Sequence, residues 1–197
     1  MNIIKVRNKF EISEFHKTVN LLYKNQKNWI PHITQDIESI FNASKNPYHN
    51  NGEIERFILR KEHKTIGRIA VFYTKKESVG GIGFFECINN QNAANLLFES
   101  SITWLKERKI EAMDGPINFG EKDKYWGLLV EGFDKHTVYG QNYHLDYYKN
   151  LFENFGFKAY YNQHVYCKDL NEPYPDKFYE RANRIKQRSS ISFAHMK

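Results

Sequence analysis

The sequence predicts an α/β (α+β) domain with a mixed, twisted sheet and helices on both of its faces. Three strand-patterned segments follow one another across short polar turns, which is typical of antiparallel strands. A long amphipathic helix then leads into another strand, and this order requires a crossover to a parallel neighbour. With 197 residues, 41% of them hydrophobic, the chain is long enough for one such domain and its core.

Alternating apolar residues and an enrichment in β-branched and aromatic residues mark the predicted strands. The glycines of residues 80–83 predict a hairpin turn, with a bulge in the strand that begins there. A final pair of strands after the last core helix is expected to complete the sheet. The predicted strands are residues 2–6, 56–60, 66–73, 81–88, 111–117, 157–161, 164–170 and, near the C-terminus, 191–195.

Apolar residues at helical spacing mark five predicted helices. Ser13 is positioned to cap the first of them. The third is the clearest, because Leu97 and Trp104 lie on one apolar stripe. The fourth ends at Gly156, a residue typical of helix C-termini, and residues 118–142 before it are expected to be irregular. The predicted helices are residues 13–23, 34–41, 93–109, 146–155 and 177–187.

Composition and charge argue against several classes of protein. The net charge is +6 and the pI is near 9.1, so the surface attracts anions such as phosphates. The basic residues are scattered, and the densest run, residues 181–188, leaves nucleic-acid binding as a weaker alternative. Cys87 and Cys167 alone do not make a disulfide framework, which favours reduced thiols in the cytoplasm. We expect no metal site, signal peptide or membrane span.

Residues 89–94, NNQNAA, close a predicted strand and open the longest predicted helix. Such a loop directs free main-chain N–H groups and the positive end of the helix dipole at one place. A diphosphate fits there, because it needs several donors at once. A plain asparagine-capped helix would have the same sequence, so both interpretations stay open.

This loop and other segments resemble the GNAT (Gcn5-related N-acetyltransferase) family. The sequence NNQNAANLL at residues 89–97, followed by WLKER at residues 104–108, is similar to the family's pyrophosphate loop, Q/R-x-x-G-x-G/A, and its leucine-rich helix. The sequence LFENFGF at residues 151–157 is similar to the family's Y-x-x-x-G-F segment. The sequences DGP at residues 114–116 and GLLVEGFD at residues 127–134 resemble an uncharacterised Bacteroidetes-type group of GNAT-like proteins.

Members of that group are commonly longer than this chain, and the resemblance covers about residues 3–170. It implies one GNAT-like domain, residues 1–170. Residues 171–197 would be a C-terminal extension of a helix and a strand, which begins a missing second half. An incomplete sheet edge would then favour a homodimer.

The resemblance also implies a reaction: transfer of an acetyl or other acyl group from acyl-CoA, the co-substrate, to a small-molecule or peptide amine. The amine would attack the thioester directly. Glu86, near the end of the central strand, is the candidate base. Asp123, Glu131 and Asp134 are weaker candidates, and each of these carboxylates is alternatively a solvated side chain. The residues expected to hold the acyl-CoA are Phe85, Cys87, Ile88, Asn89, Asn90, Gln91, Asn92, Ala93, Ala94, Asn118 and Tyr147.

The sequence departs from the family pattern at three positions. Asn89 stands in place of arginine or glutamine, and Asn92 in place of the first glycine, although asparagine tolerates left-handed backbone better than most residues. Phe152 stands where the family has a tyrosine that protonates the departing thiolate, so Tyr148, one turn earlier, is the candidate donor. Tyr147 and Tyr148 are alternatively core or surface tyrosines. A GNAT-shaped binding or scaffold protein without catalysis therefore remains a second hypothesis.

Overall fold

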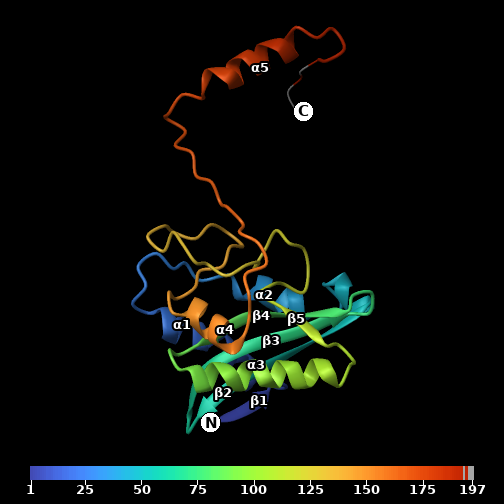
Figure 1. Cartoon of the computed structure of the whole chain (residues 1–197), viewed down its shortest axis with the longest axis vertical. Coiled ribbons are helices and arrows are strands. Elements are labelled where there is room, and N and C mark those ends of the chain that lie inside the picture. Colours follow the sequence, from blue (N-terminus) through green and yellow to red (C-terminus); the bar gives the residue numbers. More distant parts are fainter. Residues whose placement is uncertain (193, 195–197) are drawn as a thin grey trace. The chain divides into compact units, whose positions relative to one another are not determined.

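The computed structural model describes residues 1–192 and 194, and the chain forms two compact units (Figure 1). The first unit spans Met1–Tyr160, and the second begins at Tyr161. The first unit contains the sheet and four α-helices. The only regular element described in the second unit is the helix α5 (Asp176–Lys186), which confirms the helix predicted there and has no buried residue.

The sheet has five strands in the order in which they occur along the chain. The first four are antiparallel neighbours, and the fifth is parallel to the fourth because a helix crosses over between them. The mixed sheet predicted from the sequence is therefore confirmed, although it has fewer strands than expected. The strands are β1 (Asn2–Lys5), β2 (Gly52–Lys61), β3 (Lys64–Thr74), β4 (Val79–Cys87) and β5 (Ala112–Asp114).

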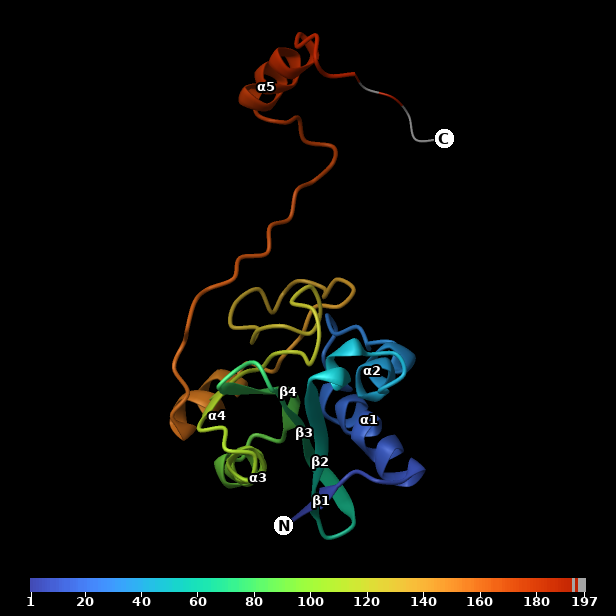
Figure 2. The same cartoon turned by 90° about the vertical axis from the view of Figure 1, so that its right-hand side faces the viewer.

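Helices cover both faces of the sheet, as predicted (Figure 2). Helices α1 (Lys9–Tyr23) and α2 (Thr34–Phe41) lie on one face, with the short 3-10 helix η1 (Pro47–Asn50) after them. Helices α3 (Gln91–Lys106) and α4 (Tyr148–Phe155) lie on the other face. The larger apolar core lies between the sheet and α3 and includes the fully buried Leu97 and Phe98.

The first helix begins earlier than predicted, at Lys9, and Ser13 is not its cap. The Asn8 side-chain oxygen accepts hydrogen bonds from the main-chain N–H groups of Phe10 and Glu11, both at 3.0 Å. The Glu11 carboxylate accepts in return from the Asn8 N–H at 3.2 Å. This reciprocal pair is a capping box. It adds four residues to the helix that the apolar spacing alone did not reveal.

The glycines at residues 80–83 lie inside β4, so the predicted hairpin turn is wrong; the turn lies at residues 75–78. They are small because neighbours approach closely. A Cβ on Gly83 would lie 2.1 Å from the Ile117 carbonyl oxygen. The predicted bulge is present, but farther along the strand: the register with β3 shifts between Arg68 and Ala70, opposite Glu86 and Gly83.

The two strands predicted at residues 157–161 and 164–170 are absent. That part of the chain has no regular structure, and Tyr160, Tyr166 and Leu170 are about nine-tenths exposed. Alternating apolar residues favour a strand only where a neighbouring strand supplies hydrogen bonds, and no described segment does so here. Ile191, Ser192 and Ala194 are likewise not in a strand, and positions 193 and 195 of the predicted C-terminal strand lie outside the described residues.

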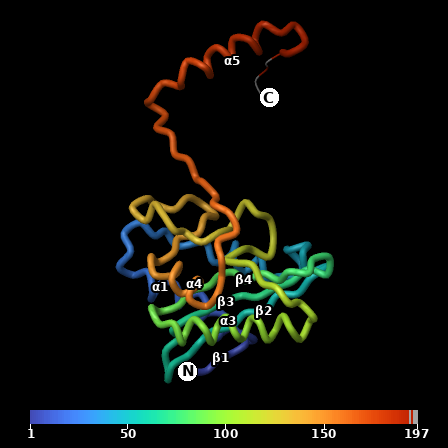
Figure 3. Tube along the Cα trace, in the orientation of Figure 1, coloured from blue at the N-terminus to red at the C-terminus, as the bar shows by residue number. Residues whose placement is uncertain are grey.

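The segment between β5 and α4 is irregular, as predicted (Figure 3). Main-chain hydrogen bonds tie it together and to the end of β5. The Tyr125 N–H donates to the Gly140 carbonyl at 2.6 Å, and the Gly127 N–H donates to the Pro116 carbonyl at 2.8 Å. The segment delivers the buried side chains of Tyr143 and His144 to the end of the sheet.

Candidate active site

The open end of β4 is the centre of the candidate site. Its pairing with β5 ends at Gly81, and one further hydrogen bond joins the Ile117 N–H to the Ile82 carbonyl at 2.7 Å. On the other side, the Ile88 N–H still bonds to β3, at 3.0 Å from the Ile66 carbonyl. The Cys87 N–H and C=O therefore turn away from β3, toward the side on which β5 has ended.

Two tyrosines at the start of α4, Tyr148 and the preceding residue Tyr147, bond to these main-chain groups of Cys87. The Tyr148 hydroxyl accepts a hydrogen bond from the Cys87 N–H at 3.0 Å. The neighbouring Tyr147 hydroxyl donates to the Cys87 carbonyl at 2.7 Å. Helix α4 thus satisfies a strand edge that would otherwise leave two buried polar groups without partners. The cysteine thiol is itself inert, because burial raises its pKa to about 12.

Glu86 is buried and belongs to a polar network, so it is not a solvated side chain. Its Oε2 accepts from the Tyr148 hydroxyl at 2.8 Å, and its Oε1 lies 3.6 Å from Nη2 of the buried Arg68. Burial raises the pKa of the Glu86 carboxyl, and the guanidinium of Arg68 opposes this rise. Burial and the Glu86 charge raise the pKa of Tyr148 well above its usual value. A carboxyl group with a perturbed pKa at the end of a strand is a candidate for proton transfer.

Arg68 is anchored on the α1 side of the sheet. Its Nη1 donates to the Phe15 carbonyl at 3.0 Å, and its guanidinium lies 4.6 Å from the centre of the Phe15 ring. Its Nε is buried without a hydrogen-bond partner among the described residues. Arg68 was not among the predicted site residues, because nothing local to β3 indicates that its neighbour across the strand pair is Glu86.

The mouth of α3 is partly capped and partly free. The Asn90 side chain caps the helix by accepting from the Ala93 N–H at 2.9 Å. Among the residues described, the main-chain N–H groups of Gln91 and Asn92 have no acceptor. The Gln91 side chain instead reaches α4, where its Nε2 donates to the Leu151 carbonyl at 3.1 Å. The asparagine cap is therefore present, and the binding of a diphosphate by the two remaining N–H groups stays a prediction.

The remaining predicted contact residues fall into two groups. Phe85, Ala93 and Ala94 are buried in the core, whereas Asn89 is exposed and Ile88 half-buried. Phe85 packs against the ring of Phe152, with ring centres 5.0 Å apart, and Phe152 is itself only 3% exposed. Position 152 therefore serves the core. Phe152 has no hydroxyl group to donate a proton, and its side chain is inaccessible to a ligand.

Asn118 directly follows Ile117, whose N–H makes the last hydrogen bond from this part of the chain to β4. It is only 7% exposed, and its Oδ1 has no hydrogen-bond partner in the described part of the chain. A buried acceptor without a partner is costly, and this one is free for a donor on a ligand. The structure thus brings Glu86, Cys87 and the two tyrosines together at the end of β4, whereas Asn118 follows the bond of Ile117 to Ile82, farther back along the strand. The candidate carboxylates Asp123, Glu131 and Asp134 are exposed.

His144 also lies at the site, and no sequence motif predicted it. It is 4% exposed, and its ring centre lies 5.7 Å from that of Tyr148. Its Nδ1 accepts a hydrogen bond from the Leu129 N–H at 3.0 Å. Burial lowers the pKa of His144 to about 3. Its position four residues before Tyr148 was the only available signal, because the Leu129 donor comes from a distant part of an irregular segment.

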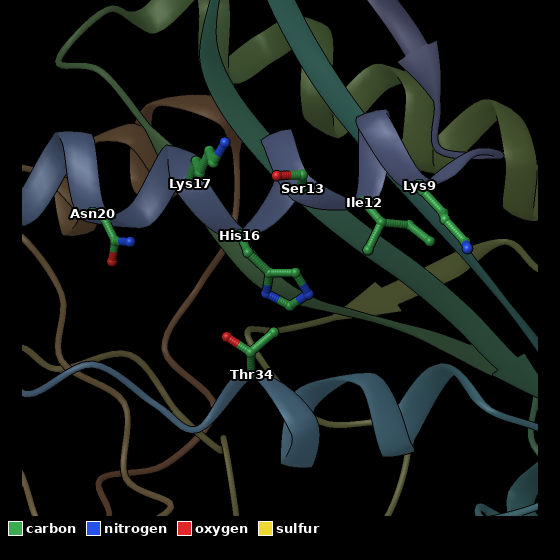
Figure 4. Close-up of a pocket in the computed structure, with 7 residues that line it drawn as sticks. All are labelled: Lys9, Ile12, Ser13, His16, Lys17, Asn20 and Thr34. Atoms are coloured by element: carbon green, nitrogen blue, oxygen red, sulfur yellow. The ribbon is translucent and has the colours of Figure 1, made fainter.

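A separate hollow lies between α1 and α2 (Figure 4). It has a volume of about 430 Å³, and its lining includes His16, Lys17 and Thr34. His16 bonds through Nε2 to the Glu38 carboxylate at 2.7 Å. No group of three metal-binding side chains occurs in the described part of the chain, and none of its helices is long and apolar enough to cross a membrane.

Comparisons with known proteins bear on the fold alone. No protein-family model and no curated protein sequence matches the chain. A predicted acetyltransferase from Clostridium acetobutylicum, solved with acetyl-CoA, matches with a TM-score of 0.51 and 13% identity over 88% of this chain and 99% of that one. The aminoglycoside antibiotic 6'-N-acetyltransferase AAC(6')-IG from Acinetobacter haemolyticus matches with a TM-score of 0.50 and 11% identity over 87% and 100%.

A tandem GNAT protein from the clavulanic acid biosynthesis pathway also aligns, with a TM-score of 0.46 and 9% identity over 55% of this chain. The aligned part is 34% of that longer protein. The two full-length matches share the mixed sheet and the helices that flank it. The chain therefore has the fold of the GNAT acetyltransferases.

Proposed function

We propose that this protein is an acyl-CoA-dependent N-acyltransferase. The observation that carries the proposal is the end of β4, where an N–H and a C=O of Cys87 turn to an edge without a neighbouring strand. Glu86 is buried directly beside them, and two unbonded N–H groups of α3 lie just beyond them in the chain. The GNAT fold supports the proposal, but it does not establish a substrate.

The residues present suit an extended ligand that carries amides and phosphates. A strand edge binds such a chain by main-chain hydrogen bonds, as in β-strand addition, and Cys87 offers one donor and one acceptor. The N–H groups of Gln91 and Asn92 suit a diphosphate at a helix N-terminus. The tyrosine hydroxyls now on Cys87 must yield to the ligand. We therefore expect the first turn of α4 to shift when acyl-CoA binds.

The bound acyl-CoA supplies an acyl thioester. In the reaction, the amine nitrogen forms a bond to the acyl carbon, the carbon–sulfur bond breaks, and the sulfur leaves as a thiolate. Glu86 is placed to accept the proton that the amine loses, and burial raises its pKa, which makes it a stronger base than an exposed carboxylate. Tyr148, hydrogen-bonded to Glu86, donates its hydroxyl proton to the departing thiolate and regains a proton from Glu86.

We further propose a small-molecule or peptide amine as the acceptor. The solved AAC(6')-IG is an aminoglycoside acetyltransferase, which makes aminoglycosides a reasonable first panel. The wall of the acceptor pocket would be aromatic. Tyr125 packs against Phe84 at the bulge and against His32, with ring centres 5.4 and 4.8 Å apart.

Calorimetric titration with acetyl-CoA tests the binding part of the proposal. Gln91→Pro removes one N–H from the mouth of α3, and proline is favoured at the first helical position. The preceding Asn90 is already extended, with φ −152° and ψ 114°, as proline requires. Gln91→Ala is the matched control, because it loses the same side-chain bonds and keeps the N–H.

We expect Gln91→Pro to bind acetyl-CoA about tenfold more weakly than Gln91→Ala, since a hydrogen bond to a charged group contributes about 1.5–3 kcal/mol. Equal affinities would contradict the site. Thiol release from acetyl-CoA with a panel of aminoglycosides, polyamines and lysine peptides tests catalysis. Lack of heat with the unmodified protein at high-micromolar acetyl-CoA would rule out the proposed function.

A second candidate function, a GNAT-shaped binding protein without catalysis, is favoured by two observations. Both main-chain groups of Cys87 are already bonded to tyrosines, and Phe152 is buried where the family has a reactive tyrosine. This candidate predicts no thiol release with any amine of the panel. Amine-dependent turnover would eliminate it.

A further inference from the structure

We propose that His144 is a further catalytic residue: its Nε2–H donates a hydrogen bond to the carbonyl oxygen of the thioester as that oxygen gains negative charge. The inference rests on the proposed N-acyltransferase function. It assigns a role to a histidine that no sequence motif marks, and it is carried by the hydrogen bond that fixes the ring.

The hydrogen bond from the Leu129 N–H fixes the tautomer of His144. A main-chain N–H can only donate, so Nδ1, at 3.0 Å, must be the acceptor and carry no proton. In the neutral ring, the proton is then on Nε2. No described residue accepts a hydrogen bond from this Nε2. The ring therefore holds an oriented donor that the protein itself does not use.

The ring lies in the candidate site. It packs against Tyr148, with ring centres 5.7 Å apart, and the Tyr148 hydroxyl bonds to both Glu86 and the Cys87 N–H. A ligand that replaces the tyrosines at Cys87 would thus enter the neighbourhood of His144. The residue is only 4% exposed, and a hydrogen bond made in such low-dielectric surroundings is stronger than the same bond in water.

The ring stays neutral over the working pH range. Burial lowers the pKa of His144 to about 3, and the nearby His32 adds to this effect. The titratable groups that face the ring are His32, from the segment before α2, and Tyr148, from α4. Burial lowers the pKa of His32 to about 4, and that of Tyr148 is raised, so both are neutral as well.

A neutral imidazole at this position is a hydrogen-bond donor and not an acid. It keeps its proton throughout the reaction, while the proton from the amine follows Glu86 and Tyr148. Donors aimed at the place where negative charge develops stabilise the transition state more than the ground state. Removal of one such donor typically lowers kcat by about 10²–10³.

Two substitutions separate catalysis from structure. His144→Asn can keep an acceptor near the Nδ1 position for the Leu129 N–H, and it removes the Nε2 donor. His144→Gln can keep a donor near the Nε2 position, and it loses the acceptor for Leu129. If the donor acts on the thioester, His144→Asn lowers kcat about a hundredfold with little change in the KM for acetyl-CoA, and His144→Gln retains most of the activity.

A purely structural role predicts the reverse order of the two variants. His144→Gln would then be the less active one, because it leaves the Leu129 N–H without a partner. Thermal unfolding gives a readout that does not depend on activity: we expect His144→Asn to be the more stable variant. The inference thus requires that the more stable variant be the less active one.

The unmodified protein should show ring ¹⁵N signals of one neutral tautomer, protonated at Nε2, from pH 5 to pH 8, and the Nε2 signal should shift when acetyl-CoA binds. Equal kcat values for both variants and the unmodified protein would overturn the role of His144 while leaving the transferase intact. Acetyl-CoA binding without turnover for any of the three proteins would overturn both proposals. A ring that titrates near pH 6 would also contradict the inference.

Discussion

Replacement of Tyr148 by phenylalanine removes one oxygen from the centre of the candidate site. That hydroxyl donates to the Glu86 carboxylate at 2.8 Å and accepts from the Cys87 N–H at 3.0 Å, and the side chain is fully buried. A hydrogen bond to a charged group contributes about 1.5–3 kcal/mol, and a buried N–H left without a partner costs about 1–3 kcal/mol. Since the two effects share one atom, we expect a loss of about 3 kcal/mol in the free energy of unfolding.

Chemical and thermal unfolding measure this loss. For a domain of this size, each kcal/mol shifts Tm by about 2–4 °C, so Tyr148→Phe should lower Tm by about 6–12 °C. Tyr147→Phe is the matched control. It removes the neighbouring hydroxyl, which donates to the Cys87 carbonyl at 2.7 Å, from a half-buried side chain. Water can replace that bond, so we expect a cost of about 1 kcal/mol.

Two results would refute this account of the site. One is a free energy of unfolding for Tyr148→Phe within about 0.5 kcal/mol of that of the unmodified protein, because loss of a hydroxyl with two buried partners must lower stability. The other is a Tyr147→Phe protein that loses as much stability as Tyr148→Phe. Either outcome would mean that α4 does not hold the end of β4 in the way described.

Three further predictions concern the fold. Asn8→Ala should cost about 1 kcal/mol by loss of the α1 cap, and Ser13→Ala should cost almost nothing; urea unfolding distinguishes them. Burial lowers the pKa of His144 from 6.5 to about 3, so stability present above pH 6.5 is lost as the pH falls toward 3. Comparison of the free energies of unfolding at pH 7 and pH 5 should show this loss, and the loss should be smaller in His144→Asn. Gly83→Ala should destabilise more than Gly80→Ala, because its Cβ would meet a main-chain oxygen at 2.1 Å and not a movable leucine side chain; equal Tm values would contradict this.

Local patterns predicted the elements that local forces determine. Helix α2 begins and ends where its apolar spacing indicated, and α4 ends at Gly156, whose φ of 114° only glycine adopts easily. The central strands and the crossover also followed from the pattern. The order of elements was therefore sufficient to predict the fold class and most of the sheet.

Features that depend on distant partners could not be predicted. Residues 157–170 have the composition of strands, but strand pairing requires a neighbour that the sequence pattern does not specify. Glu86 and Tyr148 were predicted as site residues, whereas their mutual hydrogen bond and the Arg68 ion pair depend on strand register and on the path of an irregular segment. His144 was missed for the same reason, because its partner is a main-chain group.

The two tyrosines that bond to Cys87 also protect the sheet against aggregation. The exposed edge of a strand is a template on which a foreign strand can add, and sheets with unprotected edges polymerise. Here the polar groups at the end of β4 are consumed by side chains of the same molecule, so an intruding chain would first have to unwind the start of α4. A sheet can thus stay open at one end for a ligand without becoming a seed for aggregates.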